Sequence, residues 1–323
     1  MLLPRIFWVA TSCVALSGTD KNFNICVGSD GKKQPLVFDT YEKKVVYPVS
    51  KCGVDSEGER FEGRNLKFVC LGGSVEEGED GVVGCSRVNS ATVERLPEED
   101  EKGCRAFRTG FSIPVSNNET FFHTVFSVCW NEDNKYPVWV KNKINLSVVS
   151  KDSEDLVDAG IRTKFRFSPL IFGKNYNPKT YFSIAYQKQN ILKFQNHGDF
   201  YARGHLAPAA DFFLASERWA TFSLENVIPQ WQTHNNGKWK EIEDTARNIN
   251  GAYIAKTGPV FYHGKRVQYL DQENNFLPVP HAIFKSVYNR EKQLLFHKCS
   301  DVVPACENYE EKKHCTLNKT YSH

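Results

Sequence analysis

Residues 201–248 have the sequence YARGHLAPAADFFLASERWATFSLENVIPQWQTHNNGKWKEIEDTARN. The beginning of this stretch is typical of a strand that ends by presenting His205. Its second half predicts a loop followed by a helix that begins near Asn235. Apolar residues recur there at helical spacing and define one face, which consists of Trp239, Ile242, Ala246 and Ile249.

The other faces of the predicted helix are polar and carry Asn235, Glu243 and Arg247. Glu243 and Arg247 are four residues apart, which makes them neighbours on a helix surface. The Asn-Asn-Gly at 235–237 suits a helix N-terminus, because Asn caps well and Gly tolerates the preceding turn. The stretch therefore predicts an imidazole on a strand that faces a carboxamide and an ion pair on a helix.

These residues resemble the signature of the DNA/RNA non-specific endonucleases, which are also called ββα-metal or His-Me finger nucleases. The matching positions are Ala202, Arg203, Gly204, His205, Leu206 and Ala210, followed at the family's spacing by Asn226, Pro229, Gln230, Asn235, Trp239, Glu243 and Arg247. Ala202 stands where bacterial and mitochondrial members of the family carry Asp. In having Ala at this position, the sequence is similar to the secreted arthropod branch. The resemblance spans residues 160–298. It implies an α+β fold, a ββα-metal core with an antiparallel sheet and flanking helices, preceded here by a small disulfide-stapled β-rich region.

The resemblance also implies roles for the polar residues. His205 would be the general base, oriented by a backbone carbonyl, and an imidazole suits this role because its pKa lies near neutrality. Asn235 would be the single direct protein ligand of Mg²⁺, with Mn²⁺ as the alternative ion, since Mg²⁺ retains water and needs few protein ligands. Glu243 would hold water of the metal's shell, and Asn226 and Gln230 would position the others.

Positive side chains would neutralise the phosphates of the substrate. The resemblance assigns Arg203 and Arg247 to the scissile phosphate and its neighbours. Lys238 and Lys240 flank the metal-site helix and are expected to contact substrate as well. Residues 167–202 contain no Arg, although relatives supply another phosphate-binding Arg from this segment.

Further strands are expected on both sides of the central stretch. Residues 164–167 and 181–186 are predicted as strands that precede His205, and residues 253–261 and 279–288 as strands that follow the helix, because all four segments are rich in aromatic and β-branched residues.

The chain is predicted to have four parts. Residues 1–18 are typical of a secretory signal, because the apolar run after Arg5 is too short to span a bilayer. Residues 19–150 alternate Val/Phe/Trp-rich runs with Gly, Asp and Asn turns, which predicts a β-rich, cysteine-containing accessory region. A polar, acidic run opens residues 151–298, the predicted nuclease domain, and residues 299–323 form a cysteine-containing tail. Family members usually continue further past the last strand, which favours a shortened or incomplete C-terminus.

Secretion predicts disulfides rather than free thiols. Of the ten cysteines, Cys13 leaves with the signal, so an odd number remains and at least one lacks a partner within the chain. A zinc site near the C-terminus is disfavoured because no Cys-x-x-Cys pair occurs. Sequons at Asn118, Asn145 and Asn318 fit a secreted glycoprotein.

Charge is distributed unevenly along the chain. Residues 141–298 hold 22 Lys and Arg against 14 Asp and Glu, a net charge of +8, whereas the whole chain carries only +3. A basic part of this kind fits a polyanion, because phosphate neutralisation provides most of the non-specific affinity of proteins for nucleic acids.

The sequence favours a secreted Mg²⁺-dependent endonuclease that acts on both DNA and RNA and leaves 5′-phosphate ends. One alternative is a secreted nucleic-acid-binding protein of the same fold with little turnover, which Ala202 and the absence of the upstream Arg suggest. Another is a disulfide-stapled binding module in residues 19–150. DNA and RNA are the expected partners and a membrane is not, while the oligomeric state stays open.

Overall fold

The computed structural model describes residues 23–28, 34–48, 50–51, 58–63, 65–77, 83–87, 89–116, 118–144, 164–192 and 199–302. The predicted signal at residues 1–18 and the tail from residue 303 onward lie outside the described residues. Within the described ranges no helix has the length and apolar character that crossing a membrane requires.

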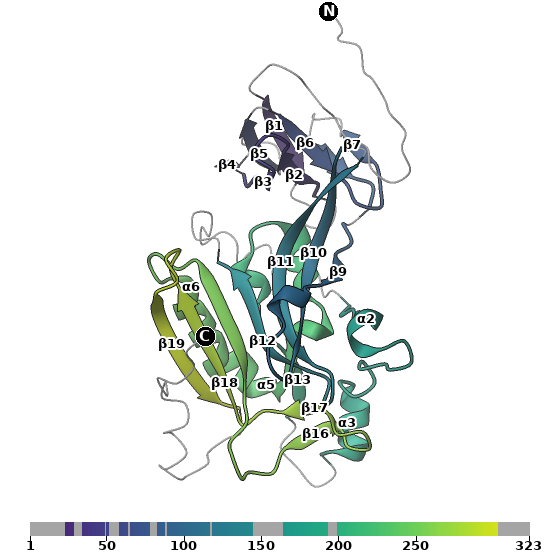
Figure 1. Cartoon of the computed structure of the whole chain (residues 1–323), viewed down its shortest axis with the longest axis vertical. Helices are drawn as coiled ribbons and strands as arrows, with labels where there is room; N and C mark the ends of the chain where they lie inside the picture. The colour runs from purple at the N-terminus through teal and green to yellow at the C-terminus, as the bar shows by residue number, and fades with distance from the viewer. Residues whose placement is uncertain are drawn as a thin grey trace, which may run out of the picture.

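The centre of the molecule is a seven-stranded antiparallel sheet with the strand order β19-β18-β15-β12-β11-β10-β9 (Figure 1). Its strands are β9 (Thr92–Arg95), β10 (Arg105–Ser116), β11 (Glu119–Asn131), β12 (Tyr136–Lys143), β15 (Ile254–Val260), β18 (Ala282–Tyr288) and β19 (Leu294–Asp301). Strands β15 and β18 confirm two of the predicted strands. In β12, buried and less buried side chains alternate over most of the strand, as a sheet with only one fully covered face requires.

This sheet joins both sides of the predicted boundary between residues 150 and 151. Residues 140–143 of β12 pair with residues 254–257 of β15. A strand of the predicted accessory region is therefore hydrogen-bonded directly to a strand of the predicted nuclease domain. The polar run that indicated a boundary lies outside the described residues, and the predicted division runs through the middle of one sheet.

Two small sheets precede the central one, with the orders β4-β5-β1-β8-β7 and β3-β2-β6. Their strands are β1 (Phe23–Gly28), β2 (Leu36–Asp39), β3 (Lys44–Val45), β4 (Ser50–Lys51), β5 (Gly58–Gly63), β6 (Leu66–Val69), β7 (Val75–Glu77) and β8 (Val83–Cys85). A disulfide between Cys70 and Cys85 joins the end of β6 to β8. The prediction of a disulfide-stapled β-rich region at the N-terminal side is confirmed.

The long β10–β11 hairpin connects the central sheet to the small sheets (Figure 1). The rings of Phe38 and Phe121 lie 5.2 Å apart, and Lys67 Nζ donates to the Pro114 carbonyl at 2.7 Å. At the other end of the hairpin, a disulfide joins Cys104 to Cys129. The hairpin is therefore fixed at both ends.

Residues 201–247 form the predicted ββα unit. The elements are β13 (Tyr201–His205), β14 (Val227–Trp231), α5 (Gln232–His234), η4 (Asn235–Trp239, a wide π-type turn) and α6 (Lys240–Arg247). The predicted helix start at Asn235 is wrong, because the helical segment already begins at Gln232 after the extended backbone of Trp231. The apolar face is confirmed: Trp239, Ile242 and Ala246 are buried, and Ile249 packs beside Ala246.

Short elements surround this unit. They are η1 (Pro97–Glu99), α2 (Pro169–Phe172), α3 (Ile184–Asn190), η2 (Ala209–Asp211), α4 (Ala215–Thr221), η3 (Leu224–Asn226) and the hairpin strands β16 (Gln268–Asp271) and β17 (Phe276–Val279). The strands predicted at 164–167 and 181–186 are wrong. The first segment makes a single bridge, between Arg166 and Ser223. In the second, the Ser183 hydroxyl accepts a hydrogen bond from the Tyr186 N–H and caps helix α3, which overrides the aromatic β propensity.

One hydrophobic cluster holds these parts together. It runs from Phe38 in the small sheets through Phe126 and Trp130 in the hairpin to Trp239 in the ββα unit, and each of these four side chains has an exposed fraction of 0%. Helix α6 packs against β18 of the central sheet. The ββα unit therefore has a rigid support on the face that carries its helix.

Candidate active site

The ribbon of β13 and β14 presents its side chains on two faces. Because residues alternate along a strand, Arg203 and His205 lie on one face, and Ala202 and Gly204 lie on the other. Gln230 pairs with Ala202 and shares its face. A Cβ on Gly204 would lie 2.0 Å from Gln230 Nε2. Glycine is therefore required at this position, because the Gln230 side chain crosses directly over it.

His205 lies between two aromatic rings. Its imidazole centroid is 5.2 Å from the ring of Phe165 and 5.0 Å from the ring of Phe222. Its Nε2 is buried and has no hydrogen-bond partner among the described residues, so ring packing, and not a carbonyl acceptor for Nε2, orients the imidazole. Burial lowers the pKa of His205 from 6.5 to about 4. The ring is consequently neutral near pH 7 and able to accept a proton.

Arg203 lies beside His205 on the same face. Its guanidinium is 5.3 Å from the ring centroid of Phe165 and 5.7 Å from that of Phe182. Its buried Nε has no hydrogen-bond partner, and no carboxylate of the described chain forms an ion pair with it. Burial lowers the pKa of Arg203, although a guanidinium remains charged in proteins. Arg203 is thus a partly desolvated cation with donors left over for a ligand.

Asn235 lies at the opposite face of the ribbon, where Gln230 fixes it. Gln230 Nε2 donates to Asn235 Oδ1 at 2.5 Å, and Gln230 itself is fully buried. This contact orients the Asn235 carboxamide and leaves its oxygen one further lone pair. The wide turn after Asn235 includes Gly237, whose backbone (φ −106°, ψ −109°) is not helical. Local widening of this kind is frequent at functional sites.

His234 belongs to the same group of contacts and was not identified from the sequence. Its Nδ1 lies 3.1 Å from Gln230 Oε1, and its Nε2 lies 2.9 Å from the Ser300 hydroxyl of β19. Burial, with a smaller contribution from Lys238, lowers the pKa of His234 to about 4. His234 therefore ties the start of the helical segment to the edge strand of the central sheet. Only its position directly before Asn235 hinted at this role.

A buried charged cluster lies under α6. Asp211 is 1% exposed, and its carboxylate contacts Arg247 (Nη1 at 3.2 Å), Lys285 (Nζ at 3.5 Å) and Asn142 (Nδ2 at 3.1 Å). Arg247 also forms an ion pair with Asp244. The ion pairs of Arg247 are therefore with Asp211 and Asp244, and the predicted pair with Glu243 is wrong as a direct contact. Asp211 and Lys285 were not among the predicted site residues.

Glu243 of α6 stands near this cluster and is half-buried. Desolvation raises the pKa of its carboxyl group to about 7, while Lys285 and Arg247 oppose the shift and Asp211 adds to it. Glu243 is thus a carboxyl group that titrates near neutral pH, close to two cations and one anion.

Asn226 is completely buried and acts on the backbone. Its Oδ1 accepts from the Ala207 N–H at 2.9 Å, and its Nδ2 donates to the carbonyls of Ala207 at 2.8 Å and Thr221 at 3.0 Å. These bonds hold the loop that leaves His205 against the chain that enters β14. Asn226 therefore fixes this loop from inside the protein, where its side chain is not accessible from the surface.

The remaining predicted residues lie at the surface or beyond the described chain. Lys238 and Lys240 are exposed on the helical segment, and Asn118 is exposed in the turn between β10 and β11. Asn145 and Asn318 lie outside the described residues.

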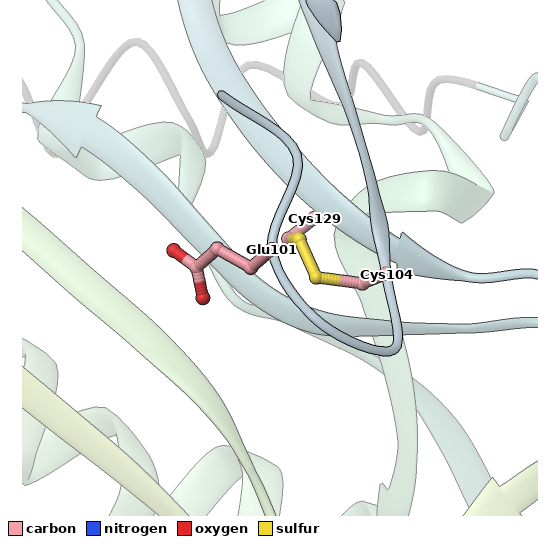
Figure 2. Close-up of side chains that lie close together, drawn as sticks. All are labelled: Glu101, Cys104 and Cys129. Carbon is pink, nitrogen blue, oxygen red and sulfur yellow. A yellow bond between two sulfur atoms is a disulfide. The ribbon is translucent and has the colours of Figure 1, made fainter. Parts of the chain in front are cut away.

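One group with the residue types of a metal site lies elsewhere and does not qualify. Figure 2 shows Glu101 beside Cys104 and Cys129, whose sulfur atoms are joined in a disulfide. A disulfide sulfur is not a thiolate and is a poor metal ligand. Glu101 instead accepts a hydrogen bond from Trp139 Nε1 at 3.1 Å. Cys299 is also disulfide-bonded.

The structure thus groups the predicted residues into three neighbourhoods. His205 and Arg203 share one face of the ribbon, Gln230 and Asn235 share the other, and Arg247 and Glu243 surround the Asp211 cluster. Within the described ranges no hydrogen bond or ion pair joins His205 to Asn235.

Comparisons with known proteins fit this arrangement. The sequence model of the DNA/RNA non-specific endonuclease family matches residues 103–314. A salivary endonuclease of Lutzomyia longipalpis is 26% identical over 213 residues, which cover 60% of this chain and 49% of that protein. A salivary endonuclease of Culex quinquefasciatus is 31% identical over 139 residues, 41% of this chain and 36% of that one.

A mitochondrial relative also matches part of the chain. Mouse mitochondrial nuclease EXOG is 27% identical over 161 residues, 50% of this chain and 38% of that protein. The chain therefore spans at most about half the length of these curated relatives. The family match covers most of the central sheet together with the whole ββα unit, and on this ground the chain belongs to the DNA/RNA non-specific endonuclease family, with arthropod salivary endonucleases among its relatives.

Proposed function

We propose that this protein is a secreted endonuclease that uses a divalent metal ion, Mg²⁺ or alternatively Mn²⁺, to hydrolyse phosphodiester bonds of DNA and RNA to 5′-phosphate products. The observation that carries the proposal is the position of His205 at the end of β13, between the rings of Phe165 and Phe222, where burial lowers the pKa of its imidazole. Membership of the DNA/RNA non-specific endonuclease family supports the reaction class, which is hydrolysis of phosphodiester bonds.

His205 is the general base of the proposed reaction. A neutral imidazole takes a proton from the attacking water, and the aromatic rings of Phe165 and Phe222 hold its plane. Arg203 lies two residues away on the same face and neutralises charge that develops on the phosphate oxygens. Its free donors and its poor solvation both strengthen this interaction. Lys238 and Lys240 extend the positive surface along the helical segment.

Two of the predicted residues offer donors that suit Mg²⁺. Asn235 offers an oriented carboxamide oxygen, Glu243 offers a carboxylate, and both are the hard oxygen donors that Mg²⁺ prefers. Asn235 would hold the ion, which when bound supplies positive charge to the phosphate. Glu243 would bind water around it once ionised. Arg247, held by Asp211, keeps α6 and therefore Glu243 in place.

Disulfides support the extracellular part of the proposal. Cys70–Cys85 and Cys104–Cys129 are bonds that persist in oxidising compartments. The salivary relatives are consistent with secretion, although EXOG is named as mitochondrial. The exposed Asn118 in a hairpin turn is an accessible glycosylation site.

A second function has three features in its favour. His205 and Asn235 lie on opposite faces of the β13–β14 ribbon, and Nε2 of His205 has no partner that orients it. A nucleic-acid-binding protein of this fold with little turnover would tolerate both features. Ala202, in place of the Asp of bacterial and mitochondrial family members, points the same way.

One experiment separates the two functions. Supercoiled plasmid and a structured RNA are incubated with secreted protein in Mg²⁺ or EDTA, beside His205→Ala and, as a matched control, the exposed His263→Ala. Metal-dependent loss of both substrates by the wild type and the control, but not by His205→Ala, supports the nuclease. Retarded but intact nucleic acid in a gel shift of every sample supports the binder instead.

A further inference from the structure

The segment from Lys164 to Leu192 has an unusual composition. Its 29 residues contain five Lys and Arg, no Asp or Glu, and seven aromatic residues. All four of its lysines are exposed, and three of them, Lys174, Lys179 and Lys188, follow Phe172 in the chain. No carboxylate of the described chain forms an ion pair with any of these three. Unpaired cations interleaved with aromatic rings are typical of surfaces that bind single-stranded nucleic acids.

The structure ties the first end of this segment to the surroundings of His205 and the second end to the start of strand β13. At the first end, the Arg166 N–H donates to the Phe222 carbonyl at 3.0 Å, and the Leu224 N–H donates to the Arg166 carbonyl at 2.8 Å. Phe222 is one of the two rings that flank His205, and Phe165 is the other. The segment therefore contributes one wall of the His205 environment.

The second end is held by a buried amide. Gln187 is fully buried, and its side chain donates to the Tyr201 carbonyl at 2.9 Å and accepts from the Tyr201 N–H at 2.8 Å. Tyr201 is the first residue of β13, the strand that ends at His205. Helix α3 is therefore held at the start of the strand, about 13 Å along it from His205 at about 3.3 Å per residue, so a strand of several nucleotides bound on α3 extends to His205.

The aromatic rings between the two ends form a continuous series. Ring centroids are 6.2 Å apart for Phe172 and Tyr176, 5.5 Å for Tyr176 and Tyr181, and 5.1 Å for Tyr181 and Tyr186. The three tyrosines are half-buried, so each ring is supported from behind and keeps part of its surface open. Ile184, at the start of α3, is 44% exposed and adds apolar surface next to them.

We propose that residues 164–192 form a binding surface for single-stranded nucleic acid that leads to His205. Tyr181 and Tyr186 stack on bases, and Lys174, Lys179 and Lys188 neutralise the phosphates between them. A duplex keeps its base faces stacked inside, so it gains only the phosphate contacts. The surface therefore gives a preference for single strands. This inference rests on the proposed function, because it assumes that nucleic acid is the ligand.

The test measures binding without cleavage, in a His205→Ala background. Fluorescence anisotropy follows a labelled single strand of about 20 nucleotides and its duplex as NaCl increases. Lys174, Lys179 and Lys188 are changed together to Gln. The slope of log affinity against log salt for the single strand is expected to decrease in magnitude by about 2, at about 0.7 for each phosphate contact.

A matched variant controls for net charge. Lys44, Lys102 and Lys292 are exposed and lie in other parts of the chain. Changing these three together to Gln removes the same charge and is expected to leave the slope unchanged. An equal decrease in both triple variants would overturn the proposal, because general attraction would then explain the binding.

A ring substitution tests the stacking separately. Tyr186→Leu keeps an apolar side chain on α3 and is expected to weaken single-strand binding about tenfold or more. Duplex binding is expected to change by less than about twofold, since stacking contributes nothing there. Equal losses on both ligands, or no loss on either, would contradict the proposal.

Failure of this inference is distinguishable from failure of the proposed function. If the wild-type protein cleaves nucleic acid but the lysine triple variant binds like its parent, only the proposed binding surface is contradicted. If the protein binds single strands through these residues but never cleaves them, only the proposed nuclease activity is contradicted. If the parent protein binds no nucleic acid at all, both the binding surface and the nuclease activity are contradicted.

Discussion

Asp211 and Arg247 form a buried ion pair, with 3.2 Å between Oδ1 and Nη1, that links the loop after His205 to the end of helix α6. Asp211 is 1% exposed, and its second oxygen lies 3.5 Å from the Nζ of Lys285, which is itself 0% exposed. One carboxylate therefore balances two buried cations from α6 and β18. The pair fixes the helix that carries Glu243 to the strand face beneath it.

Replacing Asp211 by Asn is expected to destabilise the protein strongly. The amide has a similar shape, but it leaves the charges of Arg247 and Lys285 without their shared counter-ion in the interior. Breaking a buried pair in this way costs about 3–5 kcal/mol. Urea unfolding followed by tryptophan fluorescence measures the loss. Asp244→Asn removes the more exposed partner of Arg247 and is the control, with an expected loss within about 1 kcal/mol. Equal losses of unfolding free energy in the two variants would show that the buried Asp211 pair stabilises the protein no more than the exposed Asp244 pair does.

The ββα unit was predictable because its information is local. A strand-like run before His205 and an apolar face at helical spacing after Asn235 indicate the elements directly, and the burial of Trp239 and Ala246 follows from that spacing. The start of the helical segment was less predictable. Asn-Asn-Gly has the composition of an N-terminus, but Gly237 instead widens the helix from inside.

Long-range features escaped prediction. The pairing of β12 with β15 joins residues more than a hundred positions apart, and a polar run between them imitates a linker. The Asp211–Lys285 contact likewise depends on how the loop after His205 crosses β18. A buried Lys in a strand has no signature in its own sequence neighbourhood. The true ion-pair partners of Arg247 were missed because Glu243 satisfied the local spacing rule.

Stability is expected to fall in mildly acidic solution because of two histidines. The pKa values of His205 and His234 are lowered from 6.5 to about 4, chiefly by burial. The unfolded chain therefore binds more protons than the folded chain between pH 6.5 and 4. Their contribution is complete above pH 6.5 and is lost as the pH falls through this window, by at most about 1.4 kcal/mol per pH unit for each residue.

Urea midpoints at several pH values test this expectation. The variant His234→Gln, which keeps an amide near Gln230 and Ser300, is expected to show a smaller change between pH 6.5 and 4 than the wild type. Exposed His263→Gln is the control and should follow the wild type. A wild-type midpoint that stays constant over the window would contradict the lowered pKa values.

Glu243 is expected to set the acid limb of activity at low metal concentration. Its pKa is raised to about 7 by desolvation, so the carboxylate form is gained as the pH rises through neutrality. His205, with a pKa of about 4, is already neutral there. The profile of kcat/KM against pH should therefore rise through about pH 7, and Glu243→Gln should lower the rate and remove this limb.

The neighbouring Glu241 provides the matched control. It is exposed on the same helix, and Glu241→Gln is expected to preserve both the rate and the limb. A limb near pH 7 that survives in Glu243→Gln would assign it to another group.

Gly204 is expected to control the metal site through Gln230. A Cβ at this position would lie 2.0 Å from Nε2 and 2.4 Å from Cδ of Gln230, so Gly204→Ala must displace the amide that orients Asn235. The Mg²⁺ concentration for half-maximal cleavage should rise at least about tenfold, as expected when support of a metal ligand is lost. Because Gln230→Ala removes the same support without a clash, Gly204→Ala added to Gln230→Ala should have little further effect, and the two changes should be non-additive. Additive effects would mean that Gly204 acts on His205 or the backbone rather than on the Gln230–Asn235 contact.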